Sequence, residues 1–444
     1  MHRPTLNGAL ARGRHEAREQ VALGAHLVRW MVLGALSGAL AGLSSYVFLE
    51  GLARVTHWRE GGRQWLVYLL PLIGLLMGVT YHVFGGRSGE GNNLLLDEIH
   101  EPTTWVPRRM APLILVGTWA SHLFGASVGR EGTALQMSGS LTDGLSRLLR
   151  LTAADRRVML IASIAGGFGA VFGVPVAGAV FALEVQSIGR MRFEAIVPAL
   201  TASIVGDQVL RGLGYHHADV AQLMPHVTPW LLIRIAGAGL LFGLVAAGYS
   251  AAAHGIKSLM AHRIRRAPLR PFIGGFAVIA LVLLFGHEYQ GLSLPLIGRA
   301  LGGEHLGFAV FALKLLFTAV TLGTGFVGGE VTPLFMMGAT LGSALALPFG
   351  IDGQLIAAVG FCAVFAGAAN TPIACAIMGV ELFGAGAFLP IAVGCVVAYV
   401  FSGHRSIYLS QRLHTAKVGS HTEGTPRLGD WRHQRGSSPG SADS

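Results

Sequence analysis

Charged residues are scarce in this 444-residue chain: they make up 13% of it, while hydrophobic residues make up 52%. A soluble protein of this length needs more charge to cover its surface. The mean hydropathy is +0.56, and the apolar residues form long blocks such as 27–50, 65–84 and 230–253. A helix that spans a bilayer needs about 20 such residues. We therefore expect an all-α polytopic membrane protein.

Cysteine and lysine are also scarce. The three cysteines all lie within apolar blocks, and their spacing fits neither a disulfide framework nor a zinc site. We expect no metal and no cofactor. Lysine occurs only at 257, 314 and 417, so the net charge of +10 comes mostly from arginine. No basic domain stands apart from the apolar blocks, which argues against nucleic-acid binding.

Arginine is concentrated near the two ends of the chain. The positive-inside rule then predicts that both termini are cytoplasmic, in a protein of the cell's inner (plasma) membrane. Residues 1–24 are polar and Arg-rich, and we expect them to form a cytoplasmic surface helix. The transmembrane domain is expected over 25–412. The remaining residues, 413–444, are rich in Gly, Ser, Arg and His and are predicted to be a disordered cytoplasmic tail.

A polar stretch at 211–229 divides the membrane domain into halves of about 25–210 and 230–412. Each half contains a glycine-rich segment with an acid in it, at 125–133 and at 323–333. Corresponding interruptions in two halves indicate a transporter built from inverted repeats. Some apolar blocks are longer than one span and others are shorter, which predicts broken and re-entrant helices.

The first glycine-rich segment contains Glu131 between Arg130 and Gly132. Glycines such as Gly129 break the helix and free backbone N–H groups, and the following run can start a new helix. A helix N-terminus inside the membrane binds an anion through its N–H groups and its dipole. The Glu131 carboxylate can occupy such a site when ionised and leave it when protonated, so we predict gating and proton transfer. The alternative is a structural ion pair with Arg130.

The second segment reads Gly-Gly followed by Glu330, Val331, Thr332 and Pro333. The glycines break the helix, and proline fits the first turn of a new one. Glu330 is a second intramembrane acid and has no adjacent arginine, so it is a functional candidate. Thr332 offers a hydroxyl donor, and Val331 a backbone N–H, to an anion.

Two further segments offer hydrogen-bond donors. Asn92 and Asn93 follow a glycine and precede a helical run, where an asparagine can cap the helix and its amide can donate to an anion. A capped loop at the membrane surface is an equal alternative. Tyr408 follows the last apolar block and offers a phenol, although a tyrosine at a membrane boundary commonly serves as an interfacial anchor.

Together these segments resemble the CLC family of chloride channels and proton-coupled antiporters. Gly-Arg-Glu-Gly at 129–132 matches a signature of that family, with Thr133 where proline is usual. The segment 328–333 occupies the place of its Gly-x-Phe-x-Pro signature. Residues 172–184 look like its helix with Pro-Leu-Ala-Gly and an acid. The resemblance covers about 25–412 and implies a CLC-type inverted-repeat fold and a homodimer.

Three departures from the chloride pattern are similar to the fluoride-selective branch of the family. Gly-Asn-Asn-Leu at 91–94 replaces the chloride-type Gly-Ser-Gly-Ile-Pro. Glu330 and Val331 replace an apolar pair. Val185 takes the place of the glutamate that accepts protons on the inner side of chloride antiporters. The neighbouring Glu184 remains a possible proton acceptor, although its position in the motif favours a structural role.

The resemblance implies a role for each candidate residue. Glu131 would be the external gating acid, Asn92 would replace the chloride-coordinating serine, and Tyr408 would be the central tyrosine. Glu330 and Thr332 would line the inner side of the pathway.

We therefore predict a fluoride/proton antiporter that sits in membrane lipid and exports fluoride from the cytoplasm in exchange for protons. Fluoride is small and strongly hydrated, so amide and hydroxyl donors must replace its lost water. A chloride or nitrate transporter or channel on the same fold is the alternative. An enzyme is disfavoured because the sequence contains no His-Glu-x-x-His, no paired aspartates and no nucleophile elbow.

Overall fold

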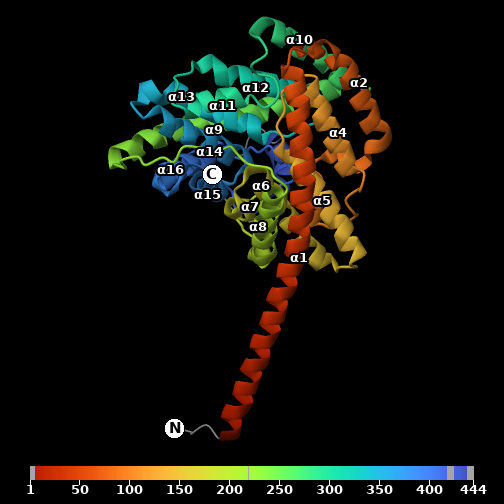
Figure 1. Cartoon of the computed structure of the whole chain (residues 1–444), viewed down its shortest axis with the longest axis vertical. Coiled ribbons are helices and arrows are strands. Elements are labelled where there is room, and N and C mark those ends of the chain that lie inside the picture. Colours follow the sequence, from red (N-terminus) through yellow and green to blue (C-terminus); the bar gives the residue numbers. More distant parts are fainter. Residues whose placement is uncertain (1–5, 219, 418–424, 438–444) are drawn as a thin grey trace.

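The computed structural model describes residues 6–218, 220–417 and 425–437, and their regular structure is almost entirely helical (Figure 1). The helices before residue 213 are α1 (Leu6–Glu60), α2 (Leu70–Thr80), α3 (Asn92–His100), α4 (Met110–Leu123), α5 (Glu131–Leu148), α6 (Ala153–Phe172), α7 (Pro175–Glu184) and α8 (Ile196–Gly212). The later helices are α9 (Pro229–Arg263), α10 (Leu269–Phe285), α11 (Leu294–Leu301), α12 (Phe308–Gly323), α13 (Val331–Phe349), α14 (Gly353–Ala369), α15 (Pro372–Phe383), α16 (Phe388–Phe401) and α17 (Leu428–Ser437). Short 3-10 or π turns are η1 (Gln64–Leu69), η2 (Tyr81–Gly85), η3 (Gly86–Glu90), η4 (Phe193–Ala195) and η5 (Ala385–Ala387). In these ranges the strands are β1 (Ser187–Ile188) and β2 (Arg412–Leu413), which pair in parallel.

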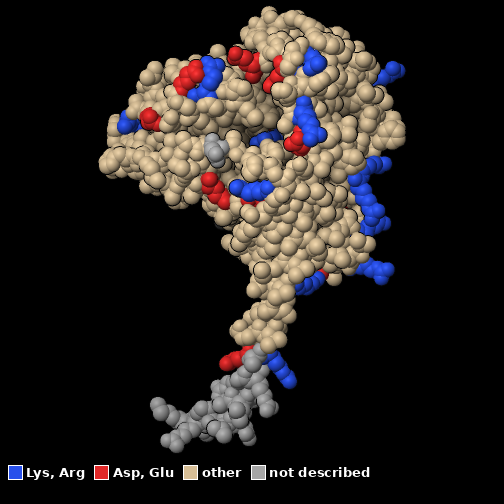
Figure 2. Space-filling view, in the orientation of Figure 1, with Lys and Arg blue, Asp and Glu red and all other residues tan. Residues whose placement is uncertain are grey.

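The surface of the helices is suited to lipid. Among the described residues, the helical stretches that are long and apolar enough to cross a bilayer are Arg18–Glu60, Gln64–Glu90, Phe193–Gly212, Pro229–Arg263 and Val331–Phe349. Several other apolar helices are shorter, as expected for broken spans. Large apolar side chains such as Leu72, Leu76 and Leu284 are exposed, and Figure 2 shows wide areas without a charged side chain. These features confirm the prediction of an all-α polytopic membrane protein.

Small residues allow α1 and α8 to pack closely. A Cβ atom added at Gly38 of α1 would lie 2.4 Å from the carbonyl oxygen of Ala202 in α8, and one at Gly42 would lie 2.5 Å from that of Gly206. Only glycine permits this approach of two helix backbones. The helix α1 itself runs along the body and projects beyond it at its N-terminal end (Figure 1). It continues without a break through residue 24, where we had placed a boundary.

The two halves of the membrane domain correspond in detail. The turn before each glycine-rich segment has a glycine with positive φ, Gly125 at +82° and Gly325 at +105°. Each half also carries, at or near the end of its short broken helix, a glutamate that caps a helix of the other half. Glu184 of α7 accepts hydrogen bonds of 3.1 and 2.8 Å from two N–H groups at the start of α15. Glu381 of α15 accepts bonds of 2.9 and 2.8 Å from the start of α7.

The chain after α16 is more ordered than its composition indicates. Leu413 and Leu428 are fully buried and pack together in a small apolar cluster beside β1. The prediction of a disordered tail over 413–444 is therefore wrong for residues 413–417 and 425–437. Two isolated leucines in a polar segment do not produce a periodic pattern, yet they are enough to dock it on an existing surface.

Candidate functional site

The two glycine-rich segments lie side by side and exchange a pair of backbone hydrogen bonds. The N–H of Gly129 donates to the oxygen of Gly329 at 2.6 Å, and the reverse bond is 2.9 Å. A Cβ atom at Gly329 would lie 2.8 Å from the nitrogen of Gly132, so glycine is required for this approach. Helices α5 and α13 begin within two residues of the bridge, at Glu131 and Val331. The unpaired N–H groups of both helix N-termini therefore lie close together.

Glu131 is fully buried, and its carboxylate caps the N-terminus of α13. Its Oε2 accepts hydrogen bonds from the backbone N–H groups of Thr332 at 3.0 Å and Arg130 at 3.1 Å. The Thr332 hydroxyl donates to its Oε1. The Arg130 guanidinium is farther away, with Nε 3.6 Å from Oε1. The carboxylate thus occupies a helix N-terminus of the kind that binds anions, and the ion pair with Arg130 is the looser of its contacts.

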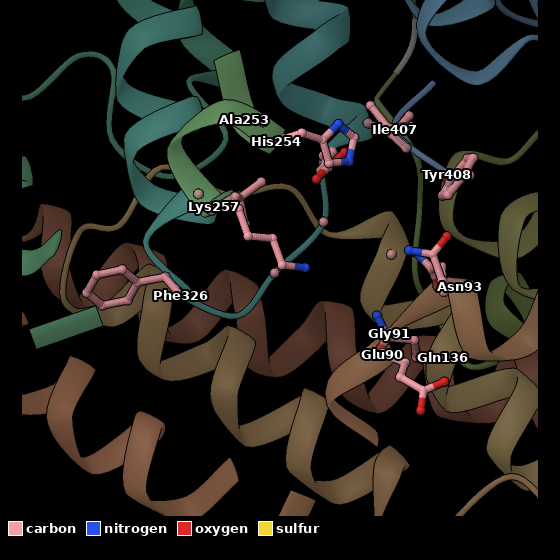
Figure 3. Close-up of a pocket in the computed structure, with 18 of the residues that line it drawn as sticks. Glu90, Gly91, Asn93, Gln136, Ala253, His254, Lys257, Phe326, Ile407 and Tyr408 are labelled. Carbon is pink, nitrogen blue, oxygen red and sulfur yellow. The ribbon is translucent and has the colours of Figure 1, made fainter. Parts of the chain in front are cut away.

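A cavity of about 180 Å³ adjoins the bridge. Figure 3 shows Tyr408 and Asn93 on one side of it and His254 and Lys257 on the other. Six of the nine predicted site residues line it: Asn92, Asn93, Gly132, Glu330, Val331 and Tyr408. The other three, Gly129, Glu131 and Thr332, form the adjoining hydrogen-bonded cluster around the Glu131 carboxylate.

Glu330, directly before α13, lines the cavity. Its environment differs from that of Glu131, because no residue in the described part of the chain donates a hydrogen bond to its carboxylate. Lys257 on α9 and the phenol of Tyr408 lie close enough to interact with it electrostatically. Glu330 is therefore part of the cavity lining, whereas the hydrogen-bonded Glu131 carboxylate is not.

Asn92 and Asn93 have different partners at the start of α3. The Asn93 Oδ1 accepts a 3.0 Å hydrogen bond from the backbone N–H of Ser410, which holds the segment after α16 in place. The Asn92 Oδ1 is buried and has no partner among the described residues. The Nδ2 of Asn92 is directed at Gly132, where an added Cβ would lie 3.1 Å away. The Nδ2 of Asn92 donates no hydrogen bond within the described part of the chain, so it is the amide group that is free to donate to an ion, whereas Asn93 holds the cavity wall in place.

Tyr408 is 6% exposed and lines the cavity, so it is not the interfacial anchor that its sequence position also allowed. Its phenol interacts electrostatically with both Glu330 and Glu131. The neighbouring Ile407 N–H donates to the Ala368 oxygen at the end of α14, at 2.9 Å. Tyr408 therefore lines the cavity from a fixed segment of backbone.

The sequence patterns miss four polar residues of the cavity: Glu90, Gln136, His254 and Lys257. Glu90 ends η3 directly before Gly91 and pairs with Arg87. Gln136 lies more than one turn into α5, and His254 and Lys257 lie within the long apolar helix α9, so these three do not belong to a helix break. The only available signal is the rarity of lysine, since Lys257 is one of three in the chain.

Neither residue at the expected inner proton position reaches the cavity. Val185 is 2% exposed and has no ionisable group, and its carbonyl accepts a hydrogen bond from the Gln411 side chain at 2.7 Å. The Glu184 carboxylate is occupied by the N-terminus of α15. The structural role that the motif favoured for Glu184 agrees with this geometry.

Comparison with known proteins places these features in a wider context. A family model described as voltage gated chloride channel matches residues 73–403. A chloride/fluoride channel protein of Pseudomonas syringae pv. tomato is 45% identical over 412 residues, which cover 90% of each chain. The crystal structure of a CLC-type fluoride/proton antiporter superposes with a TM-score of 0.84 at 33% identity and covers 87% of this chain and 98% of that one. A slow cyanobacterial Cl⁻/H⁺ antiporter shares the fold, with a TM-score of 0.75 at 20% identity over 84% of this chain and 94% of that one.

Proposed function

The chain belongs to the voltage gated chloride channel family, also called CLC, and we propose that it is an antiporter that exports fluoride in exchange for protons. The observation that carries the proposal is the Glu131 carboxylate on the N-terminus of α13, next to a cavity with an open second acid. The names of the relatives support the same ion. One similar protein is called a chloride/fluoride channel protein, and one similar structure is that of a fluoride/proton antiporter.

The donors around the cavity suit a small, strongly hydrated anion. Such an ion enters a low-dielectric site only if hydrogen-bond donors replace its water. The Nδ2 of Asn92, the phenol of Tyr408 and the N–H groups at the start of α13 offer these donors. Lys257 adds a positive charge at the cavity wall, which raises the local concentration of anions.

Glu131 and Glu330 have different roles in proton transfer. When Glu131 is ionised, its carboxylate takes the N–H of Thr332 that an anion would use, so carboxylate and anion compete for one place. When an anion displaces it, the protonated side chain carries the proton away. Glu330 exchanges protons with the cavity, because it is the acid next to the glycine bridge that lines the cavity.

We further propose a homodimer in the inner membrane with cytoplasmic termini. Exposed apolar residues on α8 and α16, such as Leu200, Ile204 and Val396, offer a surface for a second copy. Cross-linking in native membranes tests this arrangement.

Anion selectivity decides between fluoride and the chloride alternative. Liposomes that contain the purified protein are loaded with equal concentrations of sodium fluoride and sodium chloride, and the initial efflux of each ion is followed with selective electrodes. The proposal predicts fluoride efflux well above chloride efflux. Chloride efflux as fast as fluoride efflux would reject it.

A further inference from the structure

A second polar cluster lies away from the cavity and consists of basic side chains. Arg59, near the end of α1, is 4% exposed, while His122 of α4 and Lys314 of α12 are fully buried. The Lys314 ammonium donates to two backbone oxygens and one hydroxyl of the loop 289–293, at 2.7 to 3.1 Å. No carboxylate in the described part of the chain forms an ion pair with Lys314. This lysine holds the loop in place through hydrogen bonds to neutral groups.

The basic groups converge on the space in front of Gly291. A Cβ atom built there would lie 3.3 Å from the Nδ1 of His122 and 3.4 and 3.5 Å from the two terminal nitrogens of Arg59. Both ring nitrogens of His122, the Nε of Arg59 and the Nε2 of Gln290 are buried and have no hydrogen-bond partner among the described residues. Several buried polar atoms without a partner therefore lie together next to the Gly291 backbone, where a side chain would crowd them.

The charge of the cluster is poorly compensated. Arg59 donates to the carbonyl of His122 at 2.9 Å and pairs with Glu60 at 2.8 Å. The Glu60 side chain is 58% exposed, so water weakens its effect on the buried side. Buried positive charge without a buried counter-ion is costly. An anion among these donors would remove that cost.

The cluster is reached from the face opposite the first cavity. A surface cavity of about 270 Å³ is lined by Arg59, Gln64 and His287, with Glu60 and Glu288 also in its wall. Gln64 precedes the membrane-length stretch Gln64–Glu90, whose other end lines the first cavity. The helix α10 likewise separates the α9 end that lines the first cavity from the loop that lines the second. The two cavities thus lie at opposite ends of the same helices.

The cluster also packs against the loop that leads to Glu131. The carbonyl of His122 accepts a hydrogen bond from the N–H of Gly125 at 3.2 Å, and the Gly291 N–H donates to the Ala126 oxygen at 3.0 Å. The Ser127 hydroxyl is 3.0 Å from that of Thr318, one turn after Lys314 on α12. The cluster therefore lies beside the start of the segment that leads to Glu131.

We propose that Arg59, His122 and Gln290 form a second binding site for a small monovalent anion, on the route between Glu131 and the membrane face where α1 ends. That the transported ion is fluoride rests on the proposed function. The existence of the site rests on the unpartnered buried polar atoms of Arg59, His122 and Gln290 and on the cavity that Arg59 and Gln290 line.

Transport kinetics test the site in use. The variant His122→Phe keeps an aromatic ring but removes both nitrogens, and Arg59→Lys keeps the charge but loses the planar fork. Arg54→Gln, on the same helix with an exposed side chain, is the matched control. We expect the half-saturating fluoride concentration to rise about tenfold in His122→Phe and about threefold in Arg59→Lys. The fluoride-to-proton ratio should not change, and Arg54→Gln should equal the wild type. An unchanged half-saturation in both variants would overturn the proposal.

Bromide diffraction tests the site independently of fluoride transport. Crystals grown in sodium bromide should show an anomalous peak between Arg59, His122 and Gln290, and this peak should be absent in His122→Phe. If His122→Phe does not fold, the wild-type peak and the Arg59→Lys kinetics still decide. A peak in a protein that moves no fluoride keeps the site and rejects the proposed function. Fluoride transport with no peak and unchanged kinetics rejects the site and keeps the function.

Discussion

The Glu131 carboxylate lies 3.0 Å from the backbone N–H of Thr332, although 201 residues separate them in the chain. The contact joins the two halves of the membrane domain at the point where both are broken by glycine. It places an ionisable group on a helix N-terminus that could otherwise hold an anion. Gly129 pairs with Gly329, so the two halves align with Glu131 opposite Val331 and Arg130 opposite Glu330. The two acids therefore occupy different positions in their halves.

Removal of the Glu131 charge should uncouple protons from fluoride. In Glu131→Gln the amide oxygen can still accept the Thr332 hydrogen bond, but the side chain can neither ionise nor release a proton. We expect proton flux to fall at least about tenfold while fluoride still moves. Parallel electrode recordings from liposomes measure both fluxes, with Glu194→Gln, an exposed acid, as the control. Unchanged proton flux in Glu131→Gln would remove this residue from the proton path.

The two asparagines should respond differently to substitution. Asn92→Ser replaces the amide that is free to face the ion with a hydroxyl on a shorter side chain. We expect the preference for fluoride over chloride to fall about tenfold, as for one lost hydrogen bond. Asn93→Leu removes the acceptor for Ser410 and should lower the melting temperature in detergent with less effect on preference. Efflux ratios and thermal melts separate the two effects. A larger loss of preference in Asn93→Leu would reverse the assignment.

Lys257 should accelerate transport through its charge. Because the attraction of an anion to an exposed ammonium is screened by salt, Lys257→Gln should slow fluoride transport about threefold at low ionic strength and little at high ionic strength. Lys257→Arg should restore the rate. The initial rates in a salt series measure the effect, and equal slowing at every salt concentration would argue for a packing role instead.

An ion-pair cluster should stabilise α3 and hence the position of Asn92. Glu98 accepts hydrogen bonds from Arg87 at 2.7 Å and from Arg156 at 3.2 Å, and Arg156 also binds Asp143. Glu98 lies near the end of short α3, outside the membrane-length helices. Burial alone would raise the pKa of Glu98, but the hydrogen bonds from Arg87 and the Thr104 N–H, together with Arg156, outweigh it and hold the pKa below its ordinary value.

This cluster predicts a pH-dependent stability. Since the pKa of Glu98 is lower in the folded protein, its stabilisation is present above pH about 4.5 and is lost as the pH falls below that value. Glu98→Gln should lower the melting temperature by about 5 °C at neutral pH, because it leaves Arg156 partly unpaired. The difference between variant and wild type should shrink in acid. A constant difference from pH 7 to pH 4 would contradict the assignment.

Glu184 and Glu381 should behave as a matched structural pair. Each accepts two backbone hydrogen bonds at the start of the other's helix. Glu184→Gln and Glu381→Gln should each weaken one cap by about 1 kcal/mol and lower thermal stability to a similar degree. The fluoride-to-proton ratio should stay the same in both. A changed ratio in Glu184→Gln alone would show that Glu184 carries protons.

Features that depend on local chemistry could be predicted from the sequence. The apolar blocks indicated the membrane fold. The glycine breaks pointed to Glu131 and Glu330, because an acid next to helix-breaking glycines can be recognised in the sequence itself. The family resemblance supplied Tyr408, whose burial no local pattern indicates. The structure, in contrast, was needed to distinguish Asn92 from Asn93, since only the contact with Ser410 separates them.

Features that depend on distant contacts could not be predicted. His122 and Arg59 are 63 residues apart, and their contact arises from the packing of α1 against α4. The reciprocal caps of Glu184 and Glu381 likewise require both halves to be folded. Docking of the tail through Leu413 depends on a surface that the sequence pattern does not show.

The coupling of the two ions is the central claim, and one recording tests it most directly. Liposomes that contain the wild-type protein are loaded with sodium fluoride and diluted into fluoride-free, weakly buffered medium, while a fluoride electrode and a pH electrode record together. Antiport predicts that the external pH rises as fluoride leaves, because protons enter the liposomes even against an opposing proton gradient. A proton ionophore should abolish this rise. Fluoride efflux of the same speed without any rise in pH would contradict it.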